Sequence, residues 1–179
     1  MARGRHATQV EWFEPELRGI LPLDHFHVPQ SLAKFMRKCS YSISMNTCFE
    51  RVITACADAP RTHDGGTWIN NEIITAYCEL HRLGFAHSVE VWEHDEFVGG
   101  LYGVSLGRAF FGESMVSFKP NASKMALVAL VQWLREQGYT LLDTQYVNEH
   151  LKQFGVQEIR KEEYKERLQA ALGVPNGGG

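Results

Sequence analysis

Hydrophobic positions recur along this chain with two periods, which predict a mixture of helices and strands. Apolar residues three and four positions apart predict helices over 32–38, 48–57, 70–84, 121–138, 149–154 and 162–172. Alternating apolar and polar residues predict strands over 41–45, 88–92, 97–104, 108–117, 139–147 and 156–159. Three of these strands follow one another with only turns between them, so we expect an antiparallel meander.

The expected helices have recognisable ends. The residues that can cap them through a side-chain oxygen are Ser31, Asn46 or Thr47, Asn70 or Asn71, and Asn121 with Ser123. Gly84, Gly138 and Gly155 follow three of the helices and are expected to end them.

The helix over 121–138 is apolar on nearly every side, which predicts that it lies buried across a sheet. The order of elements therefore indicates an α+β fold: an N-acetyltransferase-like (GNAT-like) mixed, largely antiparallel sheet flanked by helices. In the strand 97–104, Gly99, Gly100 and Gly103 indicate either a bulge or the close approach of another group to the backbone. Close packing of a helix against the strand is the alternative.

The composition fits one ordinary globular domain. The chain has 179 residues, of which 44% are hydrophobic and 22% charged. We expect a single domain over 12–172, a flexible start over 1–11 and a disordered glycine-rich tail over 173–179. No apolar run reaches the ~18 residues that a membrane span needs, and no leader is recognisable, so we expect a cytoplasmic protein.

The four cysteines have no Cys-x-x-Cys spacing, and the pair His25 and His27 has no third ligand nearby in the sequence. We therefore expect reduced thiols and no metal site. The net charge is −3, but Lys and Arg are in slight excess up to residue 61, and Asp and Glu beyond it. The basic residues near the start are Arg3, Arg5, Arg18, Lys34, Arg37 and Lys38, which weakly indicates an edge that faces a polyanion.

The strand over 139–147 combines apolar residues with an acid and an amide. Strict alternation would place Asp143 and Gln145 on the same face, side by side. A buried carboxylate needs a partner, and Gln145 or a bound ligand can supply it. A purely structural pair that caps neighbouring backbone is the other interpretation.

Five segments together resemble the leucyl/phenylalanyl-tRNA–protein transferases of bacteria. They are Gly-Thr-Trp-Ile over 66–69, the run from Ala76 to Trp92, Val-Gly-Gly-Leu-Tyr-Gly over 98–103, Phe-Gly-Glu-Ser-Met over 111–115 with Asn-Ala-Ser-Lys over 121–124, and Leu-Asp-Thr-Gln over 142–145. The resemblance runs from about residue 12 to about residue 168. We expect a short form, because longer members carry an additional N-terminal domain.

The resemblance implies transfer of Leu or Phe from aminoacyl-tRNA to proteins with an N-terminal Arg or Lys, which marks them for N-end-rule degradation. It implies no cofactor, since the aminoacyl ester is already activated, and we expect a monomer. Matched positions give Asp143, Gln145 and Glu113 as catalytic residues, with Gln145 accepting a hydrogen bond from the attacking amine and Asp143 polarising that amide. An ion pair between Glu113 and Arg108 is the structural alternative.

Matched positions also give Trp68, and less directly Trp12, as platforms for the 3′-adenosine of the tRNA; a core tryptophan is the alternative for Trp68. The aminoacyl side chain is expected in an apolar pocket, although plain core packing explains its residues equally well. They are Tyr77, Leu101, Phe110, Gly112, Leu127, Leu130, Leu134 and Leu142. The chain differs from the usual family pattern at Val116 and Phe118, where an aromatic residue and an arginine are usual.

Two other classes of protein remain. An acyl-CoA N-acetyltransferase would need a glycine-rich pyrophosphate loop before the helix that starts near Ala122, and the sequence there is Ser-Phe-Lys-Pro-Asn. A binding module for charged tRNA or N-terminal degradation signals would not need the three polar residues named above.

Overall fold

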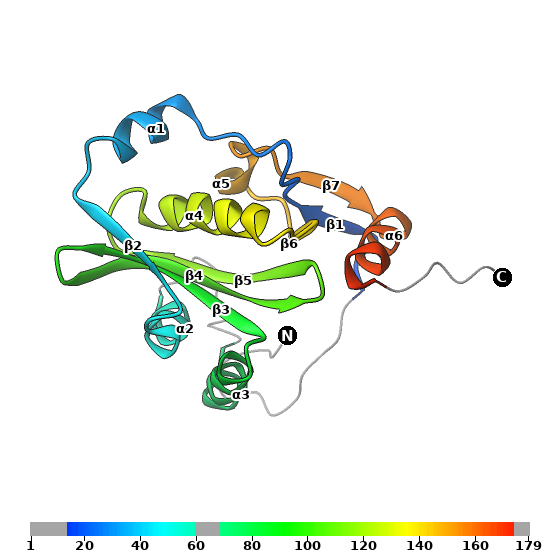
Figure 1. The fold of residues 1–179 in the computed structure, drawn as a ribbon, viewed down its shortest axis with the longest axis horizontal. Coiled ribbons are helices and arrows are strands. Elements are labelled where there is room, and N and C mark those ends of the chain that lie inside the picture. The colour runs from blue at the N-terminus through cyan, green and yellow to red at the C-terminus, as the bar shows by residue number, and fades with distance from the viewer. Residues whose placement is uncertain (1–13, 60–68, 174–179) are drawn as a thin grey trace.

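The computed structural model describes residues 14–59 and 69–173 (Figure 1). Within these ranges seven strands form one sheet in the order β2-β3-β4-β5-β6-β1-β7. The strands are β1 (Leu17–Ile20), β2 (Tyr41–Met45), β3 (Ala86–Glu93), β4 (Glu96–Leu106), β5 (Ala109–Ser117), β6 (Leu141–Gln145) and β7 (Gln157–Arg160). The helices are α1 (Gln30–Met36), α2 (Phe49–Asp58), α3 (Asn71–Arg82), α4 (Ala122–Glu136), α5 (Glu149–Lys152) and α6 (Lys161–Leu172).

Neighbouring strands are antiparallel except for β5 and β6, which run parallel and are joined through α4. A parallel pair requires such a crossover, because a tight turn cannot return the chain to the same end of the sheet. The meander β3-β4-β5 and the mixed, largely antiparallel sheet flanked by helices are as predicted. The α+β class expected from the sequence is confirmed.

The parallel pairing of β5 with β6 is short. It joins Ala109 to Leu141, Phe110 to Leu142 and Phe111 to Asp143, and then stops, although β5 continues to Ser117. The two strands thus leave a fork in the sheet beyond Asp143. On its other side β6 pairs with β1, the short strand near the start of the described chain.

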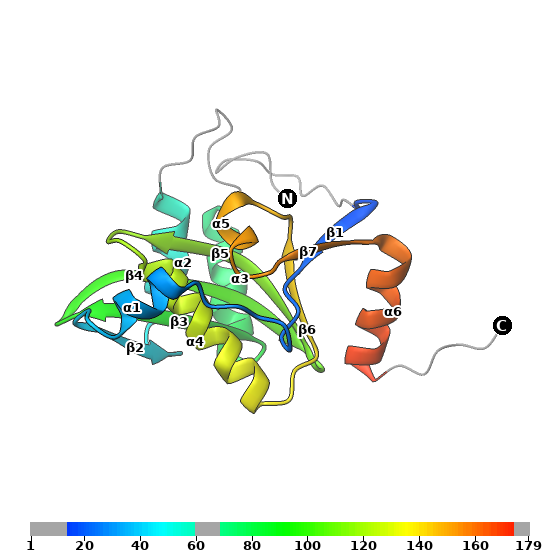
Figure 2. The same ribbon diagram turned by 90° about the horizontal axis from the view of Figure 1, so that it is seen from above.

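Helices cover the two faces of the sheet unequally. Helix α4 lies across one face, while α2 and α3 lie on the other (Figure 1), and α6 packs near the end formed by β6, β1 and β7 (Figure 2). Each layer has its own apolar cluster, and the largest one lies beneath α4. Eight residues of α4 are buried, which confirms that this apolar helix crosses the sheet.

Some predicted helix caps are present and others are not. The side chain of Asn70 accepts the N–H of Ile73 at 2.8 Å, as predicted. The prediction is wrong for Ser31, because Pro29 precedes α1 without a side-chain bond. It is also wrong for α2, because the Thr47 hydroxyl donates to Glu90 instead. Asn121 is the residue before α4, but in a left-handed conformation and without a side-chain cap.

The glycines of β4 serve two of the predicted purposes. The pairing of β4 with β5 shifts register between Tyr102 and Gly103, which is the bulge. A Cβ at Gly103 would lie 2.3 Å from the Phe111 carbonyl oxygen, so a side chain cannot fit there. A Cβ at Gly99 would lie 2.7 Å from the Cβ of Ala122, which shows that this glycine lets α4 approach the sheet.

Strand β6 is shorter than the predicted 139–147. It ends at Gln145, whose φ of 65° lies in the left-handed region. The Tyr146 N–H donates to the Thr144 carbonyl at 2.7 Å, and this closes a three-residue turn centred on Gln145. A γ-turn with positive φ at its central residue is rare and strained, and it takes the chain out of the sheet.

In the described part of the chain, no helix is both long and apolar enough to cross a membrane. The predicted flexible start (1–11) and, apart from Gly173, the predicted tail lie outside the described residues.

Candidate active site

The fork between β5 and β6 holds a cavity of about 460 Å³. Its apolar wall comes from α4, the sheet, α2 and α5, and its polar wall from β5 and the end of β6. The apolar residues are Cys56, Ala59, Leu101, Met115, Leu127, Leu130, Leu142 and Leu151. The remaining lining residues are Tyr102, Gly112, Glu113, Ser114, Thr144, Gln145, Tyr146 and Asn148. A cavity of this size, apolar on one side and polar on the other, is typical of a site for a small organic group.

Gln145 bridges the fork at the polar wall. Its Nε2 donates to the Gly112 carbonyl at 3.3 Å and points to the Glu113 Oε2 at 3.4 Å, a long contact. The β6 strand no longer pairs with β5 here, so this side chain satisfies a carbonyl that a strand would otherwise have satisfied. Gln145 therefore holds the fork together and keeps its amide beside the cavity.

Glu113 is the titratable group of the cavity wall. Its pKa is raised to about 7, first by burial and then by the negative charge of Asp143; hydrogen bonds from Tyr77 and Gln145 and the charge of Arg18 act in the opposite direction. A carboxyl group with this pKa exchanges protons at neutral pH. Burial, together with the charge of Glu113, raises the pKa of the Tyr77 hydroxyl as well, so the tyrosine remains a hydrogen-bond donor.

Asp143 is completely buried and has three partners around it. Arg18 donates through Nε and Nη2 at 3.0 and 2.8 Å, and the Tyr164 hydroxyl donates at 2.5 Å, all to Oδ2. The Gln145 backbone N–H donates to Oδ1 at 2.7 Å. Burial lowers the pKa of Arg18, but its hydrogen bonds and its attraction to Asp143 raise it more. The carboxylate is thus a paired, structural anion.

Asp143 and Gln145 do not share a face in the way that alternation predicted. Asp143 contacts Arg18 and Tyr164, whereas Gln145 lines the cavity with Leu142 and Thr144. The γ-turn at Gln145 is the reason, because a left-handed residue leaves the pleat of the strand. Asp143 contacts the backbone of Gln145, and its carboxylate makes no hydrogen bond to the Gln145 amide side chain.

The structure brings most of the predicted pocket residues together. Leu101, Gly112, Leu127, Leu130 and Leu142 all line the cavity. Tyr77 stands just behind it, packed edge to face on Tyr102 and hydrogen-bonded to Glu113. Phe110 and Leu134 are fully buried in the core beneath α4 and are not part of the wall. The alternative partner for Glu113 is engaged elsewhere, since Arg108 donates to the Gly138 carbonyl.

Sequence reasoning missed several residues of this region. Met115 stands in the Gly-Glu-Ser-Met motif and Leu151 in a predicted helix, so both carried a signal. Arg18 was grouped with the residues of a polyanion-facing edge, yet its guanidinium is held by Asp143. Tyr164 lies in a polar, exposed helix, and nothing in its local sequence connects it to the site.

The two tryptophans expected to bind the 3′-adenosine, Trp12 and Trp68, lie outside the described residues. Among the residues that the structure describes, no group of three or more His, Cys, Asp or Glu could hold a metal ion. The N-terminal end of α4 is partly satisfied from within, because the Ser117 hydroxyl accepts the Ser123 N–H at 3.2 Å.

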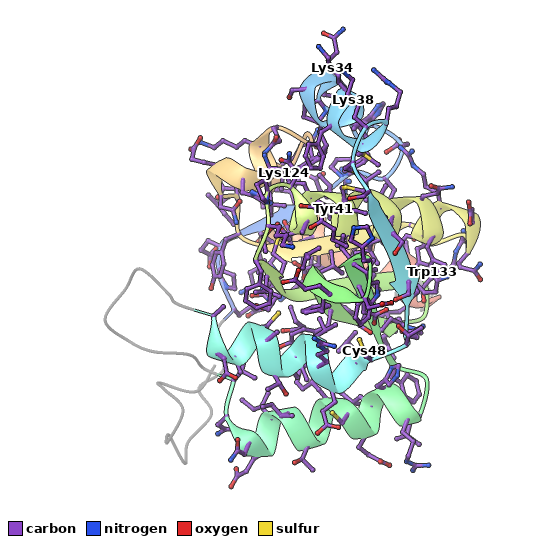
Figure 3. All side chains as sticks on the ribbon, turned by 90° about the vertical axis from the view of Figure 1, so that its left-hand side faces the viewer. Lys34, Lys38, Tyr41, Cys48, Lys124 and Trp133 are labelled. Carbon is purple, nitrogen blue, oxygen red and sulfur yellow. The ribbon has the colours of Figure 1, made fainter. Side chains whose placement is uncertain are left out.

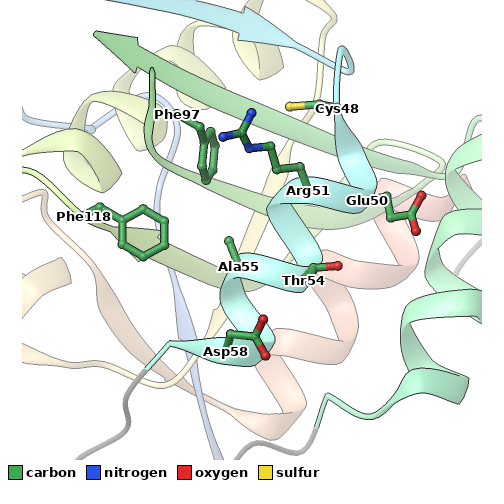
Figure 4. A pocket seen from close by; sticks show the side chains of 8 residues that line it. All are labelled: Cys48, Glu50, Arg51, Thr54, Ala55, Asp58, Phe97 and Phe118. Carbon is green, nitrogen blue, oxygen red and sulfur yellow. The ribbon is translucent and has the colours of Figure 1, made fainter. Parts of the chain in front are cut away.

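A larger, more open hollow of about 710 Å³ lies beside α2 (Figure 4). It contains none of the predicted site residues. Its one cationic side chain, Arg51, lies over the rings of Trp92 and Phe97 at 5.4 and 5.3 Å. The exposed ring of Phe118 forms the opposite edge of this hollow (Figure 4). The cavity in the fork is smaller, but Glu113 and Gln145 line it, and it is therefore the candidate active site.

Comparisons with known proteins identify the family of this chain. The family model described as leucyl/phenylalanyl-tRNA protein transferase matches residues 20–169. A leucyl/phenylalanyl-tRNA–protein transferase of Paramagnetospirillum magneticum is 54% identical over 172 residues, covering 96% of this chain and 82% of the relative. One from Maricaulis maris is 51% identical over 173 residues, covering 96% of this chain and 79% of the relative.

Among solved structures, a conserved protein of unknown function from Staphylococcus epidermidis is similar in fold, with a TM-score of 0.51 and 11% identity over 80% of this chain and 57% of the other. With a family model matched over most of the chain and relatives above half identity, the chain belongs to the leucyl/phenylalanyl-tRNA–protein transferase family.

Proposed function

We propose that this protein transfers leucine or phenylalanine from aminoacyl-tRNA to the N-terminal Arg or Lys of proteins and thereby marks them for N-end-rule degradation. The aminoacyl-tRNA is a co-substrate, and the reaction requires no cofactor. The protein acts as a monomer in the cytoplasm. Membership of the family supports transfer from tRNA to protein, while the choice of acceptor residue rests on the resemblance of the sequence.

The single observation that carries this proposal is the cavity in the fork of the sheet. Its leucines can hold an apolar aminoacyl side chain, and Glu113 and Gln145 stand at its polar wall. The volume of about 460 Å³ leaves room for a Leu or Phe side chain and its ester group. An apolar pocket of this kind distinguishes side chains by ~1–3 kcal/mol per methylene-sized difference.

The reaction itself is aminolysis of an ester. The α-amine of the acceptor, whose pKa is ordinarily ~7.7–8.0, attacks as the free base; the new C–N bond forms and the bond from the carbonyl carbon to the ribose oxygen breaks. One proton must leave the nitrogen and one must reach the ribose oxygen. Glu113, with a pKa of about 7, can take the first proton and return it to the leaving oxygen.

Gln145 is placed to align the amine. Its Nε2 is used by Gly112 and Glu113, and among the described residues nothing donates to its Oε1. That oxygen can therefore accept a hydrogen bond from the incoming amine. An amide is too weak a base to take the proton, so alignment is its role, and alignment can supply ~7–11 kcal/mol of the barrier.

The tRNA body needs a cationic surface. Lys34, Arg37 and Lys38 are exposed on or just after α1, and Figure 3 shows Lys34 and Lys38 at its outer end. Each phosphate contact releases counterions and makes binding depend on salt. We propose that these residues contact the tRNA backbone, and that Trp68 and Trp12 stack on the 3′-adenosine.

The test is transfer of radiolabelled Leu, Phe or Met from charged tRNA to a peptide that begins with Arg. Label in the peptide with Leu-tRNA and Phe-tRNA, and much less with Met-tRNA, is the expected result. A peptide beginning with Ala serves as the acceptor control. Binding of charged tRNA without transfer would instead favour a binding module, and label transferred from acetyl-CoA would favour an N-acetyltransferase.

A further inference from the structure

The backbone at Gln145 is held in a strained shape by groups that do not touch the cavity. The γ-turn has its central residue at φ 65°, a conformation that residues other than glycine seldom adopt. Such a conformation persists only where surrounding contacts fix it. The contact that fixes this one is the hydrogen bond of 2.7 Å from the Gln145 N–H to Asp143 Oδ1.

Asp143 is itself fixed by side chains from β1 and α6. Its Oδ2 receives the Arg18 guanidinium at 2.8 Å and the Tyr164 hydroxyl at 2.5 Å. The Arg18 guanidinium also lies 5.3 Å from the centre of the Tyr164 ring, so these two residues support each other. Neither Arg18, Asp143 nor Tyr164 lines the cavity. The arrangement can affect a reaction in the cavity only through Gln145 and the charge of Asp143.

Strand β1 packs closely against the γ-turn at Gln145. A Cβ at Gly19 would lie 2.7 Å from the Tyr146 carbonyl carbon and 3.1 Å from the Thr144 hydroxyl oxygen. Strand β1 therefore presses directly against the γ-turn, and Arg18 is the residue just before Gly19. The turn is enclosed by β1 on one side and by the Asp143 carboxylate on the other.

We propose that Arg18, Asp143 and Tyr164 form a clamp, the Asp143 clamp, which holds the backbone N–H of Gln145 and so aims its amide side chain across the fork. Asp143 then acts by position, through the main chain, and does not polarise the Gln145 amide. Arg18 and Tyr164 become positioning residues for the transfer reaction. This inference rests on the proposed function for its kinetic consequences, while its structural part stands without it.

The first test compares Tyr164→Phe with Tyr41→Phe. Both remove one hydroxyl that hydrogen-bonds, to Asp143 in one case and to the Pro120 carbonyl in the other. In the transfer assay we expect Tyr164→Phe to lower kcat by about 10-fold, since a hydrogen bond to a charged group is lost. KM for Phe-tRNA should stay within about 2-fold, because no substrate contact is removed. A kcat equal to that of Tyr41→Phe would overturn the clamp.

The second test asks for rescue by the conservative variant. Arg18→Gln removes the charge and the paired donors, whereas Arg18→Lys keeps a charge but only as a point donor. We expect kcat to fall in the order wild type, Arg18→Lys, Arg18→Gln, with Arg160→Gln on strand β7 as the control that matches wild type. Equal kcat in Arg18→Gln and Arg160→Gln would contradict the proposal.

The third test does not depend on activity. Amide hydrogen exchange of Gln145, followed by NMR, reports on its bond to Asp143. In Tyr164→Phe the Gln145 amide should exchange about 10-fold faster than in Tyr41→Phe, while amides of β3 and β4 stay unchanged. If wild-type protein fails to transfer label, the proposed function is wrong but this exchange measurement still decides the clamp. Unchanged exchange at Gln145 would overturn it.

Discussion

Two carboxylates stand on either side of Gln145, and their surroundings are opposite. Asp143 is completely buried and bound by a guanidinium, a hydroxyl and a backbone N–H. Glu113 is partly buried in the cavity wall, no cation among the described residues forms an ion pair with it, and its pKa is raised to about 7. The same functional group is thus fixed by hydrogen bonds on one side and left able to exchange a proton on the other.

The difference teaches how this sheet separates two tasks. The Asp143 carboxylate is occupied by hydrogen bonds from Arg18, Tyr164 and a backbone N–H, so it gives rigidity. A carboxylate desolvated beside a cavity binds and releases protons where the reaction needs it. Gln145 contacts both, through its backbone on one side and its side chain on the other.

The largest effect is expected from Asp143→Ala. It leaves Arg18 partly buried without its partner, and breaking such a pair costs about 3–5 kcal/mol of unfolding free energy. Urea unfolding should show this loss together with loss of transfer activity. The control is Glu163→Ala, which breaks the exposed pair with Arg167 on α6 and should cost less than about 1 kcal/mol. Similar losses of unfolding free energy in Asp143→Ala and Glu163→Ala would show that Asp143 contributes no more to stability than an exposed carboxylate does.

Glu113→Gln should reduce kcat by about 10²-fold or more, the usual contribution of a proton-transfer group. In wild type, activity should rise with pH as Glu113 loses its proton near pH 7 and again as the acceptor amine does so. In the variant only one rise of activity should remain, at about pH 7.7–8.0, where the acceptor amine loses its proton. A pH–rate profile identical to that of wild type would show that Glu113 does not accept the proton.

Glu113 also makes stability depend on pH, and stability should fall with rising pH where activity rises. Because the folded pKa of Glu113 lies above its ordinary value of 4.5, the folded state binds more protons between about pH 4.5 and 7. Stability contributed by this group is therefore lost as pH rises through that window, and Glu113→Gln should flatten this part of the stability curve.

Leu130→Ala tests the apolar wall of the cavity against Leu134→Ala, one turn further along α4. Both leucines are buried, but only Leu130 lines the cavity. Each truncation should cost about 2–5 kcal/mol of stability. Only Leu130→Ala should also change the ratio of kcat/KM for Phe-tRNA and Leu-tRNA, by about 10-fold. A change of that ratio in Leu134→Ala would mean that the pocket extends deeper than the cavity wall.

The smallest effect is expected from Gln145→Gly. Glycine adopts positive φ at no steric cost, so the unfolding free energy should rise by up to about 1 kcal/mol, less the lost hydrogen bonds of the side chain. Transfer activity should fall even so, because the aligning amide is gone. Gln145→Ala supplies the control, since it loses the same amide but keeps the strain. If both variants have the same stability, the turn is not strained.

The periodic pattern was enough to predict most of the fold. Strand β2 coincides with the predicted 41–45, and the meander and the buried α4 follow from alternation and from an apolar helix. The end of β6 could not be predicted, because the Asp143 carboxylate that bonds the Gln145 N–H is held by the distant Arg18 and Tyr164, and the Gln145 side chain bonds the distant Gly112 carbonyl. Alternation fails where contacts between residues far apart in the sequence decide the backbone conformation.

For the site, local sequence indicated the residues but not their roles. Glu113 and Gln145 stand in recognisable motifs, and both line the cavity. Arg18 and Tyr164 lie 125 and 21 positions from Asp143, and no sequence period links them. The sequence could not show which leucines line the cavity and which belong to the core, since Leu130 and Leu134 lie in the same apolar helix. The position of the fork in the folded sheet decides it.

The partners of Asp143 come from the two ends of the described chain: Arg18 follows shortly after its start, and Tyr164 belongs to α6, its last helix. A growing polypeptide that has already built the meander and α4 still lacks the Tyr164 hydroxyl. The reaction centre is therefore complete only once α6 has been synthesised, and a protease that removes α6 would take away the Tyr164 hydroxyl while the leucines of the cavity wall remain.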